Sequence, residues 1–306
     1  MADLRARVGS VELANPVMTA SGTAGHGAEL AAYFDVASLG AVVVKSQAAE
    51  PWPGNPSPRI QETTGGMLNS VGLQGGGIEH WLAHDLPGLE AAGARVVASI
   101  WGRSLEDYRR AADLLADAPP AVVAVEVNLS CPNVEHRRAM FAHSAGDAAA
   151  AIAATAGCGR PRWAKLSPNV TDLAPIAEAV AEAGAEAVTL INTVMGLAID
   201  PVTRAFRLGS GASGGGLSGP AIHPVAVRAV HDVHTALPDL PIVGVGGVST
   251  GQDAGELLLA GACAVQVGTA TFADPRAPRR VLDELQAWCA DHGVSHLDDL
   301  IGTAHG

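Results

Sequence analysis

Short hydrophobic runs alternate along the chain with longer segments whose hydrophobic positions recur at helical spacing. The runs are rich in Val, Ala, Ile and Leu, and the segments between them are rich in Ala, Leu and Glu. This alternation is typical of repeated βα units around a parallel sheet. The sequence predicts eight strands, at residues 16–20, 41–45, 96–101, 122–128, 163–166, 187–192, 242–245 and 264–267.

A count of eight strands favours a closed (β/α)8 barrel over an open doubly wound sheet. Helices are predicted at 105–116, 173–183, 225–236 and 253–260, and several end at a glycine, as helix C-termini often do. Two segments, about 48–78 and 195–222, are rich in Gly, Pro, Ser and Asn and are longer than ordinary connections. Such insertions are usually lids or subunit contacts. No linker divides the chain, so we expect one barrel domain over residues 1–306.

The composition excludes several classes of protein. Of the 306 residues, 48% are hydrophobic and 16% are charged, which is typical of a globular chain. A net charge of −12 disfavours nucleic acid or an anionic membrane as the main partner. The first residues lack the apolar core of a signal peptide, and no apolar run approaches the ~20 residues that span a bilayer. We therefore expect a cytoplasmic protein.

The four cysteines lie far apart and form no C-x-x-C pair. No histidine stands at ligand spacing from them, so we expect neither a zinc site nor an iron–sulfur cluster, and no structural disulfide in the cytosol. His231 and His234 lie three residues apart on a predicted helix, and we interpret them as solvated helix residues. The sequence therefore predicts no metal site.

Polar side chains end most of the predicted strands. In a barrel of this kind the reactive groups belong to the C-terminal ends of the strands. Six predicted strands end in or near a polar side chain, which favours a built pocket over chance. These residues are Ser21, Lys45, Ser46, Ser99, Asn128, Cys131, Lys165, Asn192 and Thr193.

The seventh and eighth predicted strands end in glycines instead. Gly246 and Gly247 follow the seventh strand, and Gly268 and Thr269 follow the eighth. Backbone N–H groups can approach an anion closely at such points, and phosphate groups often dock there in eight-fold barrels. Either pair alone fits a tight βα turn equally well. Together with Gly219 they favour a phosphorylated cofactor.

The segment 209–214 fits the dinucleotide pattern G-x-G-x-x-G. No hydrophobic strand precedes it, so we interpret it as a flexible loop and not as a nicotinamide site. Lys45 and Lys165 lie on or just after apolar strands, where a lysine needs an anionic or accepting partner. An ammonium there would stabilise the negative charge of a reduced flavin. The alternative is a lysine that reaches out to solvent.

Cys131 stands between two asparagines, Asn128 and Asn133, shortly after a predicted strand. A model thiol has a pKa of about 8.5, so some thiolate forms near neutral pH, and a nearby cation increases it. The flanking amides can donate and accept hydrogen bonds to a flat, polar ring. These features favour a reactive thiol, and the alternative is a small buried hydrophobic residue.

These motifs resemble those of the dihydroorotate dehydrogenases, FMN-dependent oxidoreductases of pyrimidine biosynthesis. The resemblance covers nearly the whole chain and rests on four segments in the family's order, followed by the glycines at the phosphate side. It implies a (β/α)8 barrel with FMN at the C-terminal face of the strands, and oxidation of dihydroorotate to orotate. The four segments are 69–74, 128–133, 165–169 and 215–222.

Carried over residue by residue, the resemblance makes Cys131 the base that removes a proton from carbon 5 of dihydroorotate, while carbon 6 delivers hydride to FMN. Members with Cys at this position form the soluble class, and the membrane-associated class uses Ser. Substrate would contact Lys45, Asn69, Ser70, Val71, Gly72, Leu73, Asn128, Asn192 and Thr193. FMN would contact Ser21, Lys45, Ser46, Ser99, Asn128, Lys165, Ile191, Gly219, Gly246, Gly247, Gly268 and Thr269.

The segments 53–59 and 72–74 are similar to those of the NAD-linked soluble subclass. That resemblance implies a homodimer core and a heterotetramer with a second subunit that carries FAD and an iron–sulfur cluster. Three features depart from the family: Ser99 replaces an asparagine, 75–77 is Gly-Gly-Gly, and 135–141 lacks the usual glycines. A related dihydropyrimidine is therefore an alternative substrate. A non-redox lyase or isomerase that binds a phosphorylated substrate, and a catalytically inactive scaffold, are the alternative functions.

Overall fold

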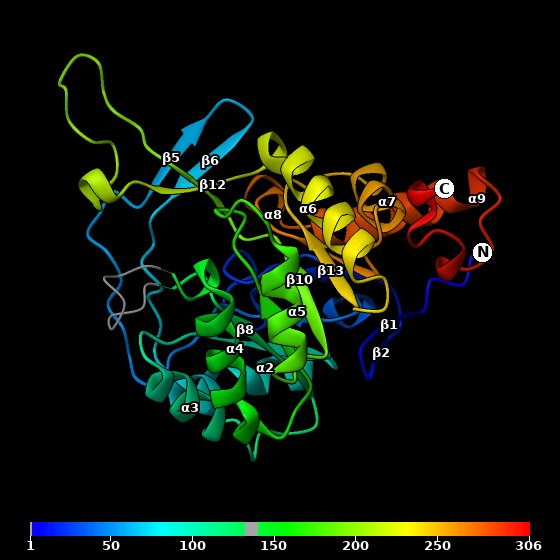
Figure 1. Cartoon of the computed structure of the whole chain (residues 1–306), viewed down its shortest axis with the longest axis horizontal. Helices are drawn as coiled ribbons and strands as arrows, with labels where there is room; N and C mark the ends of the chain where they lie inside the picture. The colour runs from blue at the N-terminus through cyan, green and yellow to red at the C-terminus, as the bar shows by residue number, and fades with distance from the viewer. Residues whose placement is uncertain (1, 132–139) are drawn as a thin grey trace.

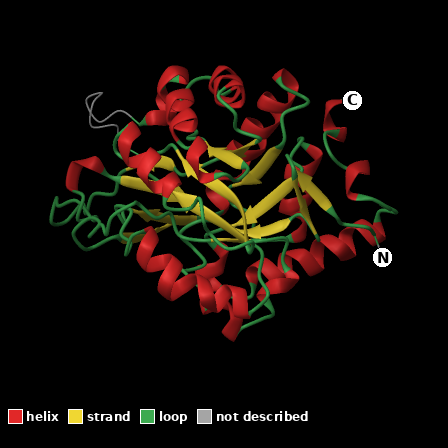
Figure 2. Cartoon of the chain, turned by 90° about the horizontal axis from the view of Figure 1, so that it is seen from below, coloured by secondary structure: helices red, strands yellow, loops and turns green. Residues whose placement is uncertain are grey.

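The computed structural model describes residues 2–131 and 140–306 of the chain. Eight parallel strands form the central sheet, and helices surround it (Figure 2). In the order of the sheet, the strands are β3 (Val17–Thr19), β14 (Ala264–Val267), β13 (Ile242–Val245), β10 (Ala187–Leu190), β9 (Arg162–Lys165), β8 (Val122–Asn128), β7 (Val96–Ile100) and β4 (Val42–Val43).

The two outer strands of this order meet and close the sheet. A parallel bridge joins Met18 of β3 to Ala41, just before β4. The N–H group of Gly40 also donates to the Val17 carbonyl at 2.9 Å. The prediction of a (β/α)8 barrel is therefore confirmed. Each predicted strand lies where the sequence places it, and β8, β13 and β14 have the predicted bounds.

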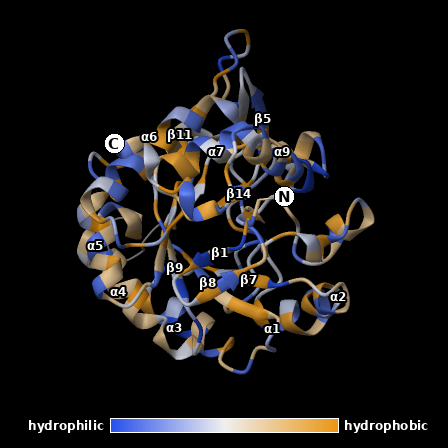
Figure 3. Ribbon diagram, turned by 90° about the vertical axis from the view of Figure 1, so that its right-hand side faces the viewer, coloured by the Kyte–Doolittle hydropathy of each residue, from blue (hydrophilic) through white to orange (hydrophobic). Residues whose placement is uncertain are grey.

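Helices cover the outside of the barrel because each buries one hydrophobic face against the strands. In α5, for example, Ile176, Ala177 and Val180 are buried and recur at helical spacing. Figure 3 shows α2, α3, α4 and α5 following one another around the ring of strands. The helices are α1 (Ile78–His80), α2 (Leu86–Ala91), α3 (Leu105–Asp113), α4 (Ala145–Ala154), α5 (Ala174–Glu182), α6 (His223–Ala236), α7 (Gly251–Leu259), α8 (Ala270–Ala273) and α9 (Ala277–Asp291).

Local capping explains where two of the barrel helices begin. At α7, the Thr250 side chain accepts a hydrogen bond from the N–H of Asp253, and the Asp253 carboxylate accepts one from Thr250 in return. At α3, the Ser104 side chain accepts a hydrogen bond from the N–H of Asp107. These caps satisfy N–H groups that have no partner inside the helix, so α7 begins two residues before the predicted 253–260 segment.

The two insertions pair with each other to form a second, smaller sheet. Its antiparallel strands, in order, are β11 (Val194–Gly196), β12 (Gly215–Ser218), β6 (Gly66–Asn69) and β5 (Ile60–Thr63). Gly66 makes the close pairing possible, because a Cβ there would lie 2.0 Å from the Ser218 carbonyl oxygen. The small sheet lies at one end of the molecule, far from both termini, where Figure 1 labels β5, β6 and β12.

The other end of the molecule carries the N-terminal hairpin, β1 (Ala6–Val8) and β2 (Val11–Leu13), whose Val8 and Leu13 are buried.

Buried hydrophobic residues from Leu4 to Leu300 form one continuous core cluster. Among the residues that the structure describes, every helix is too short or too polar to cross a bilayer.

Candidate active site

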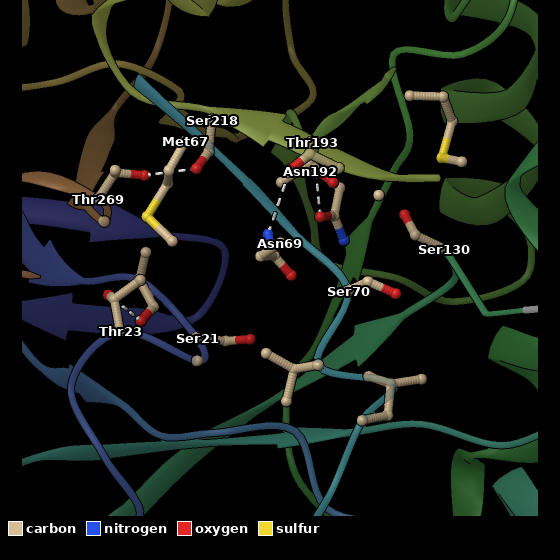
Figure 4. Close-up of a pocket in the computed structure, with 18 of the residues that line it drawn as sticks. Ser21, Thr23, Met67, Asn69, Ser70, Ser130, Asn192, Thr193, Ser218 and Thr269 are labelled. Atoms are coloured by element: carbon tan, nitrogen blue, oxygen red, sulfur yellow. Dashed lines mark hydrogen bonds between the residues drawn. The ribbon is translucent and has the colours of Figure 1, made fainter. Parts of the chain in front are cut away.

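A cavity of about 630 Å³ lies between the carboxyl ends of the barrel strands and the small antiparallel sheet. Polar side chains from both sheets point into it (Figure 4). Only two predicted site residues, Ser99 and Cys131, do not line it. The predicted residues that the structure brings together here are Ser21, Lys45, Ser46, Asn69, Ser70, Val71, Gly72, Leu73, Asn128, Lys165, Ile191, Asn192, Thr193, Gly219, Gly246, Gly247, Gly268 and Thr269.

Ser99 lies behind the cavity wall and not in it. Its side chain is completely buried, and its Oγ lies 2.8 Å from Ser46 Oγ. Ser46 Oγ in turn lies 3.2 Å from Ser21 Oγ, so three hydroxyls form a row that ends at the cavity. The structure therefore places Ser99 outside the cavity, because β7 directs its side chain to Ser46, and direct contact of Ser99 with a ligand stays a prediction. Ser99 holds Ser46 in place instead.

Cys131 is also completely buried, beside the carbonyl of Asn128. Its Sγ donates to that carbonyl at 3.4 Å, and the Tyr108 hydroxyl donates to the same oxygen at 2.6 Å. Burial raises the pKa of the Cys131 thiol to about 12, and the positive charge of Lys45 lowers it by less. Desolvation thus outweighs the nearby cation in this conformation and favours the neutral thiol, and the catalytic role of Cys131 stays a prediction. A neighbouring residue, Ser130, lines the cavity, and its Oγ has no hydrogen-bond partner among the described residues.

One wall of the cavity is made of backbone. The N–H groups of Gly246, Gly247, Gly268 and Thr269 have no acceptor among the described residues. Gly246 and Gly247 have φ angles of +140° and +70°, which residues other than glycine rarely adopt. A Cβ on Gly247 would lie 2.9 Å from the Gly219 carbonyl oxygen. Unpaired N–H groups in such a cradle fit a phosphate group.

Two lysines line the cavity. Lys165 is 5% exposed, and its Nζ lies 3.3 Å from Glu126 Oε1 and 3.3 Å from Gln266 Oε1. It therefore does not reach out to solvent, and the alternative interpretation of this lysine is wrong. Lys45 keeps some contact with the cavity, but protein surrounds it closely, and this desolvation lowers its pKa to about 8.

Side-chain amides also line the cavity and are held by hydrogen bonds within the protein. Asn128 Oδ1 accepts from Asn192 Nδ2 at 3.2 Å and from the Ser130 N–H at 3.1 Å. Asn69 Nδ2 donates to the Gly216 carbonyl at 3.3 Å, which ties β6 to β12. These bonds fix the orientations of the amides and leave further donors and acceptors for a polar ligand.

Several cavity residues were absent from the predicted site. Asn169 joins the small sheet to the barrel, because its Nδ2 donates to the Thr193 carbonyl at 3.0 Å and its Oδ1 accepts from the Met195 N–H at 2.9 Å. The Thr269 hydroxyl donates to Ser218 Oγ at 2.8 Å. Asn169 stands in the motif segment 165–169 and Ser218 in the segment 215–222, so the motifs could have indicated both residues. Ser130 and Ser167, which also line the cavity, stand in the motif segments 128–133 and 165–169, whereas Asn55 and Ser210 stand in the two insertions.

Parts of the predicted catalytic segment lie outside the described residues. These are Asn133 and the part of 135–141 before Met140. Within the described residues, no group of three or more His, Cys, Asp or Glu side chains is arranged to hold a metal ion. His231 and His234 pack against His305, with ring centroids 4.2 and 4.8 Å away, so they are not simply solvated as predicted.

Known proteins of one family match nearly the whole length of this chain. A family model described as dihydroorotate dehydrogenase matches residues 3–288. The "Dihydroorotate dehydrogenase B (NAD(+)), catalytic subunit" of Geobacter sp. (strain M21) is 46% identical over 301 residues, covering 98% of this chain and 97% of the relative. The protein of the same name from Alkaliphilus metalliredigens (strain QYMF) is 45% identical over 304 residues, covering 98% of both chains.

A solved structure supports the fold alone. The crystal structure of DHODH in complex with ferulenol from Eimeria tenella superposes with a TM-score of 0.78 at 24% identity, covering 99% of this chain and 89% of that one. The family model and the relatives, by contrast, settle the family. The chain belongs to the dihydroorotate dehydrogenase family.

Proposed function

We propose that this chain oxidises dihydroorotate to orotate, with FMN as its cofactor. The observation that carries this proposal is one cavity that joins a wall of unpaired backbone N–H groups to two lysines and a cluster of amides. The wall suits the phosphate of FMN, and the amides suit a planar ring with both donors and acceptors. Bound FMN supplies the ability to accept two electrons from the substrate.

The residues present fit FMN. The phosphate would lie against Gly219, Gly246, Gly247, Gly268 and Thr269, where a Cβ on Gly247 would occupy the cradle. Lys165, with one N–H free of the interactions with Glu126 and Gln266, would face the pyrimidine end of the flavin ring. The rest of the binding set would be Ser21, Lys45, Ser46, Asn128 and Ile191, all of which line the cavity.

Substrate would bind on the side of the cavity nearer the small sheet. Asn69, Asn128, Asn192 and Thr193 line this side and would bind the ring, while Lys45 would bind the anionic carboxylate. The segment from Ser70 to Leu73 also lines the cavity and would contribute backbone groups.

Cys131 would act as the base in its thiolate form, and the thiolate would take up the proton that leaves carbon 5 and become a neutral thiol. The hydrogen of carbon 6 leaves with its electron pair, so a double bond forms between carbons 5 and 6 and the atoms balance. Burial raises the pKa of the thiol to about 12, whereas the Tyr108 hydroxyl and then the positive charge of Lys45 lower it. Both groups would therefore favour the thiolate that the step needs.

The names of the relatives identify each as the catalytic subunit of an NAD(+) enzyme. We propose that this chain likewise works with a second subunit that carries FAD and an iron–sulfur cluster, around a homodimer core, in the cytoplasm. The four cysteines are free thiols, as is usual in a reducing compartment. Leu197, Ile199, Val202 and Phe206 are exposed hydrophobic residues on the second insertion and provide a surface for such contacts.

Orotate formation tests the proposed reaction. The purified protein is incubated anaerobically with dihydroorotate and an electron-accepting dye, beside the variants Asn192→Leu and, as a control, Gln252→Leu on the exposed face of α7. Loss of this part-buried hydrogen-bonding amide should lower kcat/KM roughly 10- to 100-fold, because such a loss costs about 1–3 kcal/mol. Gln252→Leu should behave as wild type. A colourless protein that forms no orotate would favour the non-redox phosphate-binding barrel instead.

A further inference from the structure

Four buried polar side chains form a network inside the barrel, just below the cavity. Glu126 lies at its centre and is completely buried; it stands two residues before Asn128 on β8, so both side chains point into the barrel. Glu126 Oε1 accepts from Lys165 Nζ at 3.3 Å. Glu126 Oε2 accepts from Gln266 Nε2 at 2.7 Å and from Thr189 Oγ1 at 3.2 Å. Glu126 does not line the cavity, so the proposed function gives it no role.

The network has a fixed direction of donation. A carboxylate only accepts, so Gln266 must turn its NH2 group to Glu126 and its oxygen to Lys165 Nζ, 3.3 Å away. An ammonium has three N–H donors, and these two oxygens take two of them. The third is left for the cavity, which Lys165 lines.

We propose that Glu126 is a positioning residue that holds the Lys165 ammonium toward the cavity and thereby sets the midpoint potential of bound FMN. The proposal rests on the proposed function, since it requires FMN at this site. Two-electron reduction adds negative charge to the flavin ring, and a fixed cation beside the ring favours the reduced form. Glu126 itself touches no ligand and acts through Lys165.

Glu126→Gln is the decisive change because it keeps the shape of the side chain but adds a donor. If the new amide turns its oxygen to Lys165, its NH2 group meets the NH2 group of Gln266. If Gln266 then flips, its NH2 group faces the ammonium. If the new amide turns its NH2 group to Lys165, two donors meet there directly. Every arrangement leaves a donor facing a donor, either at the Lys165 ammonium or between the two amides, so the network that positions the ammonium is weakened.

The experiment measures the midpoint potential of bound FMN in wild type, Glu126→Gln and Glu126→Asp, at one pH below about 8 so that Lys45 stays charged in all three. Glu126→Gln should weaken the binding of reduced FMN roughly tenfold relative to the binding of oxidised FMN. A tenfold change lowers a two-electron midpoint potential by about 30 mV. Glu126→Asp keeps an acceptor-only carboxylate and should lie closer to wild type. Thr189→Val removes a donor to Glu126 but no partner of Lys165. It should change the ratio of reduced to oxidised FMN affinity less than about threefold.

A purely structural role would give the opposite order. Glu126→Asp shortens the side chain and leaves a void, whereas Glu126→Gln fills the same volume, so packing alone would make Glu126→Asp the worse variant. That order, or a potential of Glu126→Gln equal to or above wild type, would overturn the proposal. If Glu126→Gln fails to retain FMN, the comparison is made on FMN affinity: retention by Glu126→Asp supports the proposal, and loss by both variants overturns it.

A double-mutant cycle with Lys165→Met tests whether Glu126 acts through Lys165. Lys165→Met should lower the potential, and adding Glu126→Gln to it should not lower the potential further. An equal shift in both backgrounds would show that Glu126 acts independently and would overturn the proposal. Absence of FMN from the wild-type protein is a different result, because it would remove the proposed function itself.

Discussion

Replacing Gly247 by alanine adds a single methyl group at the phosphate side of the cavity. We expect this change to lower both stability and FMN affinity more than Gly268→Ala does. Gly247 has a φ of +70°, and its N–H group has no acceptor among the described residues. An added Cβ would lie 2.6 Å from His223 Cβ and 2.9 Å from the Gly219 carbonyl oxygen. Neither neighbour is the free end of a flexible side chain, so the backbone of the loop has to move.

The size of the effect follows from two contributions. A left-handed conformation costs an alanine roughly 1–2 kcal/mol, and overpacking a well-filled site costs typically about 1–3 kcal/mol. Gly247→Ala should therefore lower the free energy of unfolding by about 2–5 kcal/mol in all. Displacement of its N–H group should also weaken FMN binding at least roughly tenfold, since a lost hydrogen bond to a charged group is worth about 1.5–3 kcal/mol.

The assay is denaturant unfolding of the protein without FMN, together with titration of FMN by the quenching of its fluorescence. Gly268→Ala is the matched control, because Gly268 lines the same wall but has no positive φ and its nearest contact for a Cβ is Ala20 Cβ at 3.3 Å. It should lose less than about 1 kcal/mol of stability. If Gly247→Ala were as stable as wild type, or if Gly268→Ala lost as much, the reasoning about this cradle would be wrong.

Two further predictions concern the groups that handle protons. Cys131→Ala should keep FMN but lose turnover at least about a hundredfold, as expected for loss of a general base; an unchanged rate of dihydroorotate oxidation would remove Cys131 from the mechanism. Because the pKa of Lys45 lies at about 8, its charge is present below that pH and lost above it. Orotate affinity should therefore weaken as pH rises through about 8 in wild type and stay level in Lys45→Gln. The same pH dependence in Lys45→Gln would contradict this assignment.

The barrel could be predicted from sequence because its strands are defined by their own residues. Residues 242–245 and 264–267 are short hydrophobic runs that are each followed by a glycine, and 122–128 is a largely hydrophobic run that ends at Asn128. The structure gives all three the same bounds. Helix α4 was missed because its alanines show little difference between buried and exposed faces. Helix α9 was also missed, although Val281, Leu285 and Cys289 are buried at helical spacing.

The small sheet could not be predicted from local patterns. Its central pairing joins Gly216 to Asn69, two residues that are far apart in the chain, and neither insertion has enough hydrophobic alternation to indicate a strand. The two insertions fold together only because the barrel brings the ends of β4 and β10 to the same face.

The structure brings the predicted site residues together where position along a strand decides their placement. Polar residues and glycines at the carboxyl ends of parallel strands must meet at one face, so most of them line the cavity. Cys131 and Ser99 differ because their surroundings come from other segments. Tyr108 on α3 meets Cys131 at the Asn128 carbonyl, and Ser46 after β4 takes the hydrogen bond of Ser99. A single sequence does not reveal such neighbours.

The central claim is that the cavity at the strand ends holds FMN and passes it the electrons of dihydroorotate. Anaerobic addition of dihydroorotate to the purified protein, followed by visible absorption, tests this claim most directly. We predict a yellow protein whose flavin absorption is bleached as orotate appears. A protein that binds no flavin, or whose flavin stays oxidised in excess dihydroorotate, would contradict the account.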